Sequence, residues 1–432
     1  MGGDGAFVAA LMLGLVLAGL CLRLPAPLVL AGAGMLGALL GQWVGIYDFV
    51  LLGDLASSIE AILDNETLIA IPLLVLSGTL LGGSQAFASL RLRLQGPFGA
   101  ICDLLLAMAG GGGRHEARTG RLNAAFLELL ERATPASAFL VLLSDLIDTA
   151  VRTGEGPFGE SGFAAPLLMA QMILPALLLG LIFAVSGMAF KDEDQDEGSY
   201  DPLPALWLSL SAALAALAVP ALILFQVASL VEAAALGVGA ALLLKLAGKD
   251  LRRSDLGTLL DHALTRSAIP FATLMAGALF HLVFQGIGGG EVLAPLFALQ
   301  GSDLLVTAVL SIALLGILIE PLALAVLLVP LLGPLLLDNG HSPALVGALF
   351  VLAPFPGALF PRKAVLAFAQ ACALSLVILV PMSFEMFQSA PLSEPSFEPA
   401  RQEEGFTPED TADSPQGSAN ETEHYAPPSE NE

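Results

Sequence analysis

Residues 310–336 read LSIALLGILIEPLALAVLLVPLLGPLL, and their single charged residue is Glu320, followed at once by Pro321. A charge at bilayer depth is costly, so an ionisable residue in such a run is a candidate functional site. The alternative is a turn between two helices, with the carboxylate of Glu320 in the headgroup layer. To choose between these interpretations, it must first be decided whether the whole chain is a soluble or a membrane protein.

Composition indicates that lipid surrounds most of the chain. Of its 432 residues, 56% are hydrophobic and 13% are charged, and the mean hydropathy is +0.80. Soluble domains are roughly 45–50% apolar and about 25% charged. Apolar stretches of roughly 18 or more residues recur, each long enough to cross about 30 Å of hydrocarbon. The strict alternation of a transmembrane barrel is absent, so the sequence predicts an all-α polytopic membrane protein.

Proline and glycine divide the chain into roughly 11–13 hydrophobic segments, several of them too short or too broken for simple crossings. We expect the segments near 135–150 and 343–361 to be re-entrant. Irregular backbone is tolerated at that depth only where protein or a water-filled cavity surrounds it. The first segment, 6–22, has no basic region before it and is interpreted as a transmembrane helix rather than a cleaved signal.

Two acidic segments contribute much of the formal net charge of −23. Residues 191–202 are predicted to form an acidic loop between two membrane halves, 1–190 and 203–387. The Pro-, Glu- and Ser-rich tail, 388–432, cannot bury enough apolar surface to fold, so we expect it to be disordered. Both acidic segments are interpreted as solvated, so the net charge does not indicate the charge of a substrate.

Basic residues predict the orientation of the chain. Arg23, Arg91 and Arg93 follow the first and third segments, and the loop between the second and third carries only acidic charges. The Lys/Arg bias places these three arginines in the cytoplasm and the N-terminus outside. Residues 245–266 are basic and amphipathic, which is typical of a segment on the cytoplasmic surface. Nucleophile-elbow, zinc and Rossmann patterns are absent, so we expect no enzyme activity, no bound cofactor and no nucleic-acid partner.

Two stretches far apart in the sequence resemble each other. Residues 68–81, LIAIPLLVLSGTLL, and residues 266–280, RSAIPFATLMAGALF, share Ala-Ile-Pro and a leucine four residues after the proline. Many secondary transporters consist of two structural repeats. The stretches therefore predict two repeats, with chance similarity in an apolar alphabet as the alternative.

Helix-breaking residues are dense after residue 315. Broken helices in transporters provide backbone carbonyls for Na⁺ and helix N-termini for anionic substrate groups. The alternative is a set of kinked helices that only pack together. The residues concerned are Gly316, Pro330, Pro334, Gly340, Pro343 and the segment APFPGALFPRK at 353–363.

A polar group precedes these breaks in the stretch ATPASAFLVLLSDLIDT, residues 133–149. Asp145 and Asp148 are three residues apart, so both fall on one helical face. Together with Ser137, they could line a polar cavity. They could equally end the helix at the membrane interface.

Other polar residues have structural interpretations. Ser229 and Glu232 have the spacing of a capping box, which makes Glu232 a carboxylate at a helix start. Asp103 and His281 are isolated polar residues in apolar runs. We interpret both as hydrogen-bonded structural groups rather than proton relays.

These residues resemble motifs of the large permease subunit of TRAP transporters, the tripartite ATP-independent periplasmic systems. Residues 41–81 resemble the family's amphipathic lead-in and the helix after it. Residues 228–243 are similar to its Thr-Pro-Thr-Glu-Ala-Ala-Ala-x-Gly stretch, with Glu232 on the glutamate. Pro135-Ala136-Ser137 with Asp145 is similar to a Pro-Pro-Ser segment that ends in Gly-Asp.

The fourth similarity extends from Gly316 to Pro343. Glu320 falls on an acidic position of the family, and Pro330 and Pro334 fall on its Pro-x-x-x-Pro pair. The resemblance implies a Na⁺-driven importer of organic acids such as C4-dicarboxylates, in a bacterial inner membrane. It implies two partners besides the bilayer, a periplasmic solute-binding protein and a small four-helix membrane subunit. It also implies an elevator movement of a domain with two re-entrant hairpins. The cavity-lining residues expected on this basis are Glu320, Asp145, Ser137, Pro354, Phe355, Pro356, Gly357 and Pro361.

Both hairpin regions depart from the family. The Gly/Ser/Thr/Ala-rich stretch before the Pro-Pro-Ser segment is shortened to the charged residues 107–133. The polar stretch of the second hairpin becomes residues 353–363, where Pro361 alone remains of the Thr-Pro-Pro. Side-chain oxygens that would suit Na⁺ are thereby lost, and backbone carbonyls remain. Two alternatives therefore stay open: a non-transporting scaffold that kept the fold, and an unrelated inverted-repeat carrier of ions or organic anions.

Overall fold

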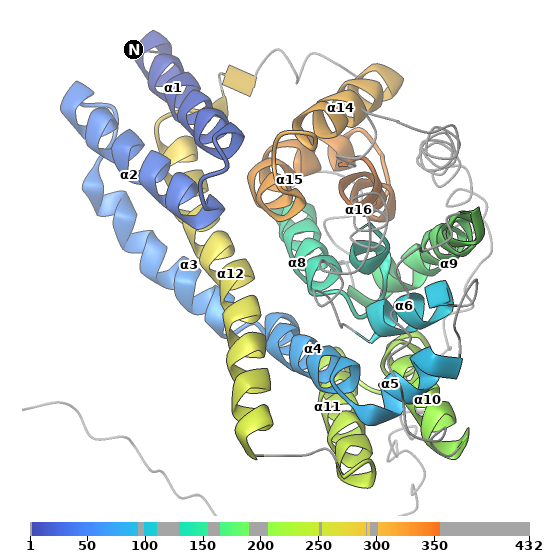
Figure 1. Cartoon of the computed structure of the whole chain (residues 1–432). Coiled ribbons are helices and arrows are strands. Elements are labelled where there is room, and N and C mark those ends of the chain that lie inside the picture. The colour runs from blue at the N-terminus through green and yellow to red at the C-terminus, as the bar shows by residue number, and fades with distance from the viewer. Residues whose placement is uncertain are drawn as a thin grey trace, which may run out of the picture. The chain divides into compact units, whose positions relative to one another are not determined.

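The computed structural model describes residues 2–93, 99–109, 129–153, 165–189, 206–249, 253–290, 292–293 and 301–354 (Figure 1). Within these ranges every regular element is a helix, which confirms the all-α prediction. By contacts the chain divides into two units, Met1–Phe387 and Gln388–Glu432, and the second lies outside the described residues. The predicted boundary between two membrane halves is not tested and stays a prediction.

The helices and their bounds are as follows. They are α1 (Gly2–Cys21), α2 (Ala26–Val44), the 3₁₀ helix η1 (Phe49–Leu52), α3 (Gly53–Leu63), α4 (Glu66–Gly82), α5 (Gln85–Arg93), α6 (Gly99–Met108), α8 (Ala138–Thr153), α9 (Ala165–Ala189), α10 (Leu206–Leu224), α11 (Leu230–Ala247), α12 (Arg253–Gly286), α14 (Gly301–Leu315), α15 (Pro321–Asp338) and α16 (Pro343–Leu352). In the described part of the chain, six of them are long and apolar enough to cross a membrane: α1, α2, α10, α11, α12 and α15. The prediction of a polytopic membrane protein is thus confirmed.

One group of helices is formed by α1, α2, α3, α4, α11 and α12. Helix α11 packs along α4, and α12 packs along both α2 and α4. Small residues permit the close approaches, as is usual between helices in lipid. A Cβ on Gly237 of α11 would lie 2.7 Å from Oγ of Ser77 of α4, and a Cβ on Gly34 of α2 would lie 3.2 Å from Cα of Phe280 of α12.

Helices α4 and α12 carry the two similar stretches found in the sequence. Each contains an internal proline, Pro72 in α4 and Pro270 in α12, and the two helices pack against each other. Their relation as structural repeats stays a prediction.

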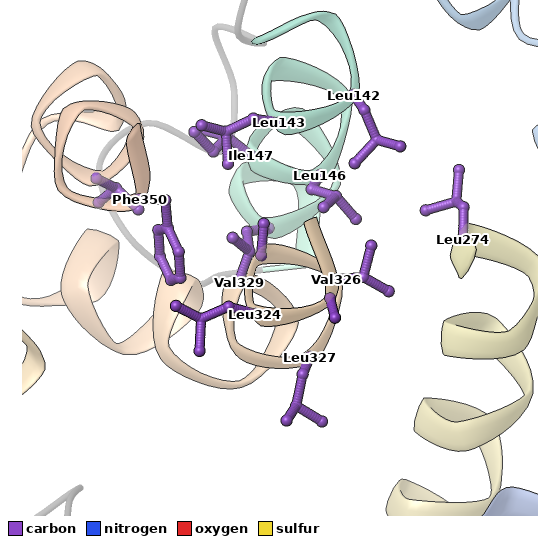
Figure 2. Packing of buried hydrophobic residues seen from close by; sticks show 14 of the residues in the cluster. Leu142, Leu143, Leu146, Ile147, Leu274, Leu324, Val326, Leu327, Val329 and Phe350 are labelled. Carbon is purple, nitrogen blue, oxygen red and sulfur yellow. The ribbon is translucent and has the colours of Figure 1, made fainter. Parts of the chain in front are cut away.

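A second group consists of α8, α9, α14, α15 and α16, which contact one another. Figure 2 shows Leu146 of α8 beside Val326 of α15, and Phe350 of α16 on the same apolar cluster. Helix α16 has ten residues, all of them buried, and its length of about 15 Å is half the hydrocarbon thickness. The re-entrant course expected for residues 343–361 stays a prediction, because residues 355–361 lie outside the described part of the chain.

A buried lysine joins α11 to α4. Lys245 has 3% of its surface exposed, and its Nζ donates to the carbonyl of Gly83, 2.7 Å away, at the C-terminal end of α4. That end carries the negative pole of the helix dipole, which favours a cation. Helix α4 therefore receives part of its C-terminal cap from another helix.

Replacing Lys245 with methionine should destabilise the protein by about 1–3 kcal/mol, because the carbonyl of Gly83 loses its charged donor while the packed stem remains. The thermal midpoint of the purified chain in detergent measures this. Lys249→Met, at an exposed position in the turn after α11, is the matched control and should leave the midpoint unchanged. Equal midpoints for the two variants would show that the Lys245 bond contributes nothing.

Candidate functional site at a junction of three helix breaks

Three interruptions of the helices meet in the second group. They are residues 134–137 before α8, residues 316–320 between α14 and α15, and residues 353–354 after α16. A Cβ on Gly316 would lie 2.5 Å from Cα of Pro354, so the second and third breaks touch. Nη1 of Arg132 donates to the carbonyl oxygen of Pro354 at 3.1 Å, which brings the segment before the first break to the same point. We call this meeting point, defined by Arg132, Gly316 and Pro354, the junction.

Helix ends of both kinds converge on these breaks. Helices α8 and α15 begin after two of them, and helices α14 and α16 end before two. Helix N-termini attract anions and C-termini attract cations, each within about one turn of the helix end. The arrangement can therefore serve an anionic substrate and a cation close to each other.

Glu320 occupies the N-cap position of α15, with extended backbone at φ −59° and ψ 136°. Pro321 takes the first helical position, where its missing N–H is not needed. The side chain of Glu320 is exposed, and it lies in the same break as Gly316, whose backbone touches Pro354. The structure thus places this carboxylate at a helix break, as the sequence predicts, and a functional role stays a prediction.

The other predicted site residues divide into two sets. Ser137 is buried and starts α8, since its carbonyl accepts from the backbone N–H of Val141 at 3.0 Å. Pro354 is buried and forms part of the junction. The remaining four predicted residues of this segment, Phe355, Pro356, Gly357 and Pro361, lie outside the described residues.

Asp145 has a partner away from the junction. The side-chain amide of Asn65 donates to Oδ1 of Asp145, while Oδ1 of Asn65 accepts from the backbone N–H of Thr67 at 2.9 Å and caps α4. Asp148 instead pairs with Nε of Arg152 at 2.8 Å on an exposed part of α8. The two aspartates that the sequence places on one helical face therefore have different roles, and Asp145 links α8 to α4.

The interpretation of His281 as a hydrogen-bonded residue agrees with the structure. Its Nε2 lies 2.9 Å from the carbonyl oxygen of Val326 in α15. Pro330 follows Val326 by one helical turn and has no N–H, so this carbonyl lacks its usual donor within the helix. The capping box of Ser229 and Glu232 is confirmed as well, with both of its hydrogen bonds present.

Sequence reasoning missed Arg132 and Asn65. Arg132 belongs to the charged segment 107–133, and nothing in its neighbourhood indicates a partner more than two hundred residues away. Asn65 carries a local signal, because asparagine directly before an apolar helix is a favoured N-cap. That signal predicts the cap on α4 but not the bond to Asp145.

Comparisons with known proteins agree with this architecture. The family described as "Tripartite ATP-independent periplasmic transporter, DctM component" matches residues 163–383. Among solved structures, the chain is similar to one reported as "Crystal structure of the Alcanivorax borkumensis YdaH transporter reveals an unusual topology". Identity is 12%, coverage is 79% of this chain and 88% of that chain, and the TM-score is 0.52. At that identity the similarity shows the fold alone. No curated protein matches the chain.

The family match settles the class of the protein. It covers more than half of the chain and contains α15, α16 and the break at Glu320. A match of this extent removes the alternative of an unrelated carrier. The chain belongs to the DctM family, the large permease components of tripartite ATP-independent periplasmic transporters.

Proposed function

We propose that this chain is the large membrane subunit of a TRAP-type secondary transporter that imports an organic acid, of the C4-dicarboxylate kind. The observation that carries the proposal is the junction, where Arg132, Gly316 and Pro354 bring together the segments beside α8, α14, α15 and α16. The last three of these helices lie inside the family match. Interrupted helices that meet inside a membrane bundle are the usual binding architecture of secondary transporters.

The chemistry of the junction supports an acidic substrate. The N-termini of α8 and α15 offer backbone N–H groups and the positive ends of two helix dipoles, which suit carboxylates. Ser137 lies at the first N-terminus and Glu320 at the second. We propose that Ser137 and the backbone from Pro354 to Pro361 line the substrate cavity, with Glu320 as a cation-attracting carboxylate.

An elevator movement is the proposed mechanism. The second helix group meets the first through α8 against α4 and α15 against α12. Among the described residues, two hydrogen bonds cross this boundary, Asn65 to Asp145 and His281 to Val326. We propose that the second group moves past the first when these bonds exchange partners, and that an ion gradient drives the movement. In this role Asp145 is a site residue because it holds one conformational state.

The proposal includes two partners and a location. A periplasmic binding protein delivers the substrate, and a small four-helix membrane subunit braces the permease in a bacterial inner membrane. The DctM family assignment supports this, since the family is described as a component of a tripartite system.

The test is uptake into proteoliposomes that contain the full chain and a candidate small membrane subunit. Labelled organic acids are offered with a candidate periplasmic binding protein under an inward Na⁺ gradient, a proton gradient or none. We expect uptake that requires the binding protein and a gradient. A folded complex that takes up nothing under any gradient would instead favour the second candidate function, a membrane scaffold. The loss of side-chain oxygens in residues 353–363 favours that candidate.

A further inference from the structure

We propose that Arg132 is a built-in cation of the junction. Its guanidinium occupies the place at the C-terminal end of α16 where a soluble coupling cation would otherwise bind. This inference adds to the proposed function, and it rests on the proposal that the junction is a transport site. Its test measures thermal stability and not uptake, so a failure of this inference can be told apart from a failure of the proposed function.

Arg132 is a buried residue that contacts the segment just after α16. The residue is 6% exposed, and Nη1 donates to the carbonyl oxygen of Pro354 at 3.1 Å. Pro354 stands two residues after the last helical residue of α16, Leu352. Arginine stays charged at every relevant pH, so a full positive charge lies at the negative end of this helix.

The chemistry of the acceptor provides the second step. Carbonyl oxygens at the C-terminal ends of interrupted helices are the groups that coordinate Na⁺ in secondary transporters. Nη1 of the Arg132 guanidinium donates to one carbonyl oxygen of this kind, and burying a charge is tolerated only when it is paired. Unlike Na⁺, it is covalently attached and cannot dissociate on either side of the membrane.

The sequence around the acceptor provides the third step. Residues 353–363 contain no Ser, Thr, Asn, Asp, Gln or Glu, so their backbone carbonyls are the oxygens that this segment can offer to a cation. The first proline carbonyl of the segment already accepts from Arg132. Gly316 permits the close approach of Pro354, whose Cα lies 2.5 Å from where a Cβ on Gly316 would be. At this carbonyl the guanidinium therefore takes the place of a soluble cation.

The experiment compares thermal midpoints of the purified full chain in sodium chloride and in choline chloride at equal ionic strength. Arg132→Ala removes the charge and leaves room for a soluble cation, so its midpoint in choline chloride should fall by about 5 °C. Sodium chloride should recover part of this loss, because an ion that binds the folded state alone raises the midpoint. Wild type and Arg132→Lys, which retain a tethered charge, should show a smaller difference between the two salts.

Arg152→Ala is the matched control, since Arg152 is an exposed arginine paired with Asp148, and its midpoint should respond to sodium as wild type does. An Arg132→Ala loss that is equal in both salts would overturn the proposal, because packing alone would explain it. If that variant does not fold, Arg132→Lys is compared with Arg132→Met. A higher midpoint for lysine supports the built-in cation, and a midpoint for methionine at or above that of lysine overturns it.

Discussion

Replacing Glu320 with glutamine should reduce uptake by the reconstituted complex at least about tenfold, which corresponds to ~1.4 kcal/mol. Glutamine keeps the size of the side chain and its hydrogen-bonding oxygen but removes the charge at the start of α15. If the carboxylate attracts a cation or stabilises one conformation of residues 316–320, its negative charge is required for uptake. The measurement is the initial rate of uptake of a labelled organic acid into proteoliposomes.

Glu320→Gln should leave the stability of the folded protein unchanged. Glu320 is exposed in the break between α14 and α15, so its neutral analogue should melt within about 1 °C of wild type. Glu60→Gln, on the exposed side of α3, is the matched control and should transport normally. Unchanged uptake for Glu320→Gln would return this residue to the interpretation of an interfacial turn.

Replacing Gly316 with alanine should both destabilise the protein and slow uptake. The added Cβ would lie 2.5 Å from the Cα of Pro354, and a backbone atom cannot rotate away as a side chain can. Overpacking of this kind costs about 1–3 kcal/mol, so we expect a midpoint lower by about 1–3 °C. The shift of Pro354 would also strain its bond to Arg132, and uptake should fall about tenfold.

A glycine on a helix with free space beside it provides the comparison. A Cβ on Gly14 of α1 would meet nothing within 4 Å, so Gly14→Ala should be neutral or should stabilise slightly through helix propensity. If Gly316→Ala behaved like Gly14→Ala, the second and third breaks would not be in firm contact, and the junction would lose its structural basis.

Local chemistry explains what could be predicted from sequence. Proline is favoured at the first helical position, where its missing N–H is not needed, and α15 begins at Pro321. Ser229 and Glu232 form the predicted capping box for the same reason, because both partners lie within one turn. Apolar length fixed the membrane class, since no aqueous fold can hide such stretches.

The partners of the site residues were beyond prediction. The sequence offered Asp145 either for a polar cavity or for a helix end at the interface, and its bond to Asn65 at the start of α4 could not be foreseen from either. Arg132 was not singled out, although it reaches Pro354 across the bundle. Both bonds join segments far apart along the chain, and their formation depends on which helices become neighbours.

The sequence alone determined that this protein lies in lipid, where its helices are interrupted, and that Glu320 stands at one of those interruptions. The tertiary structure decided which interruptions meet and which polar groups face one another there. The physical reason is that side chains facing lipid and side chains facing other helices are equally apolar in a membrane. Hydrophobic pattern therefore locates the helices but does not specify how they pair, and close contacts such as that of Gly316 with Pro354 do.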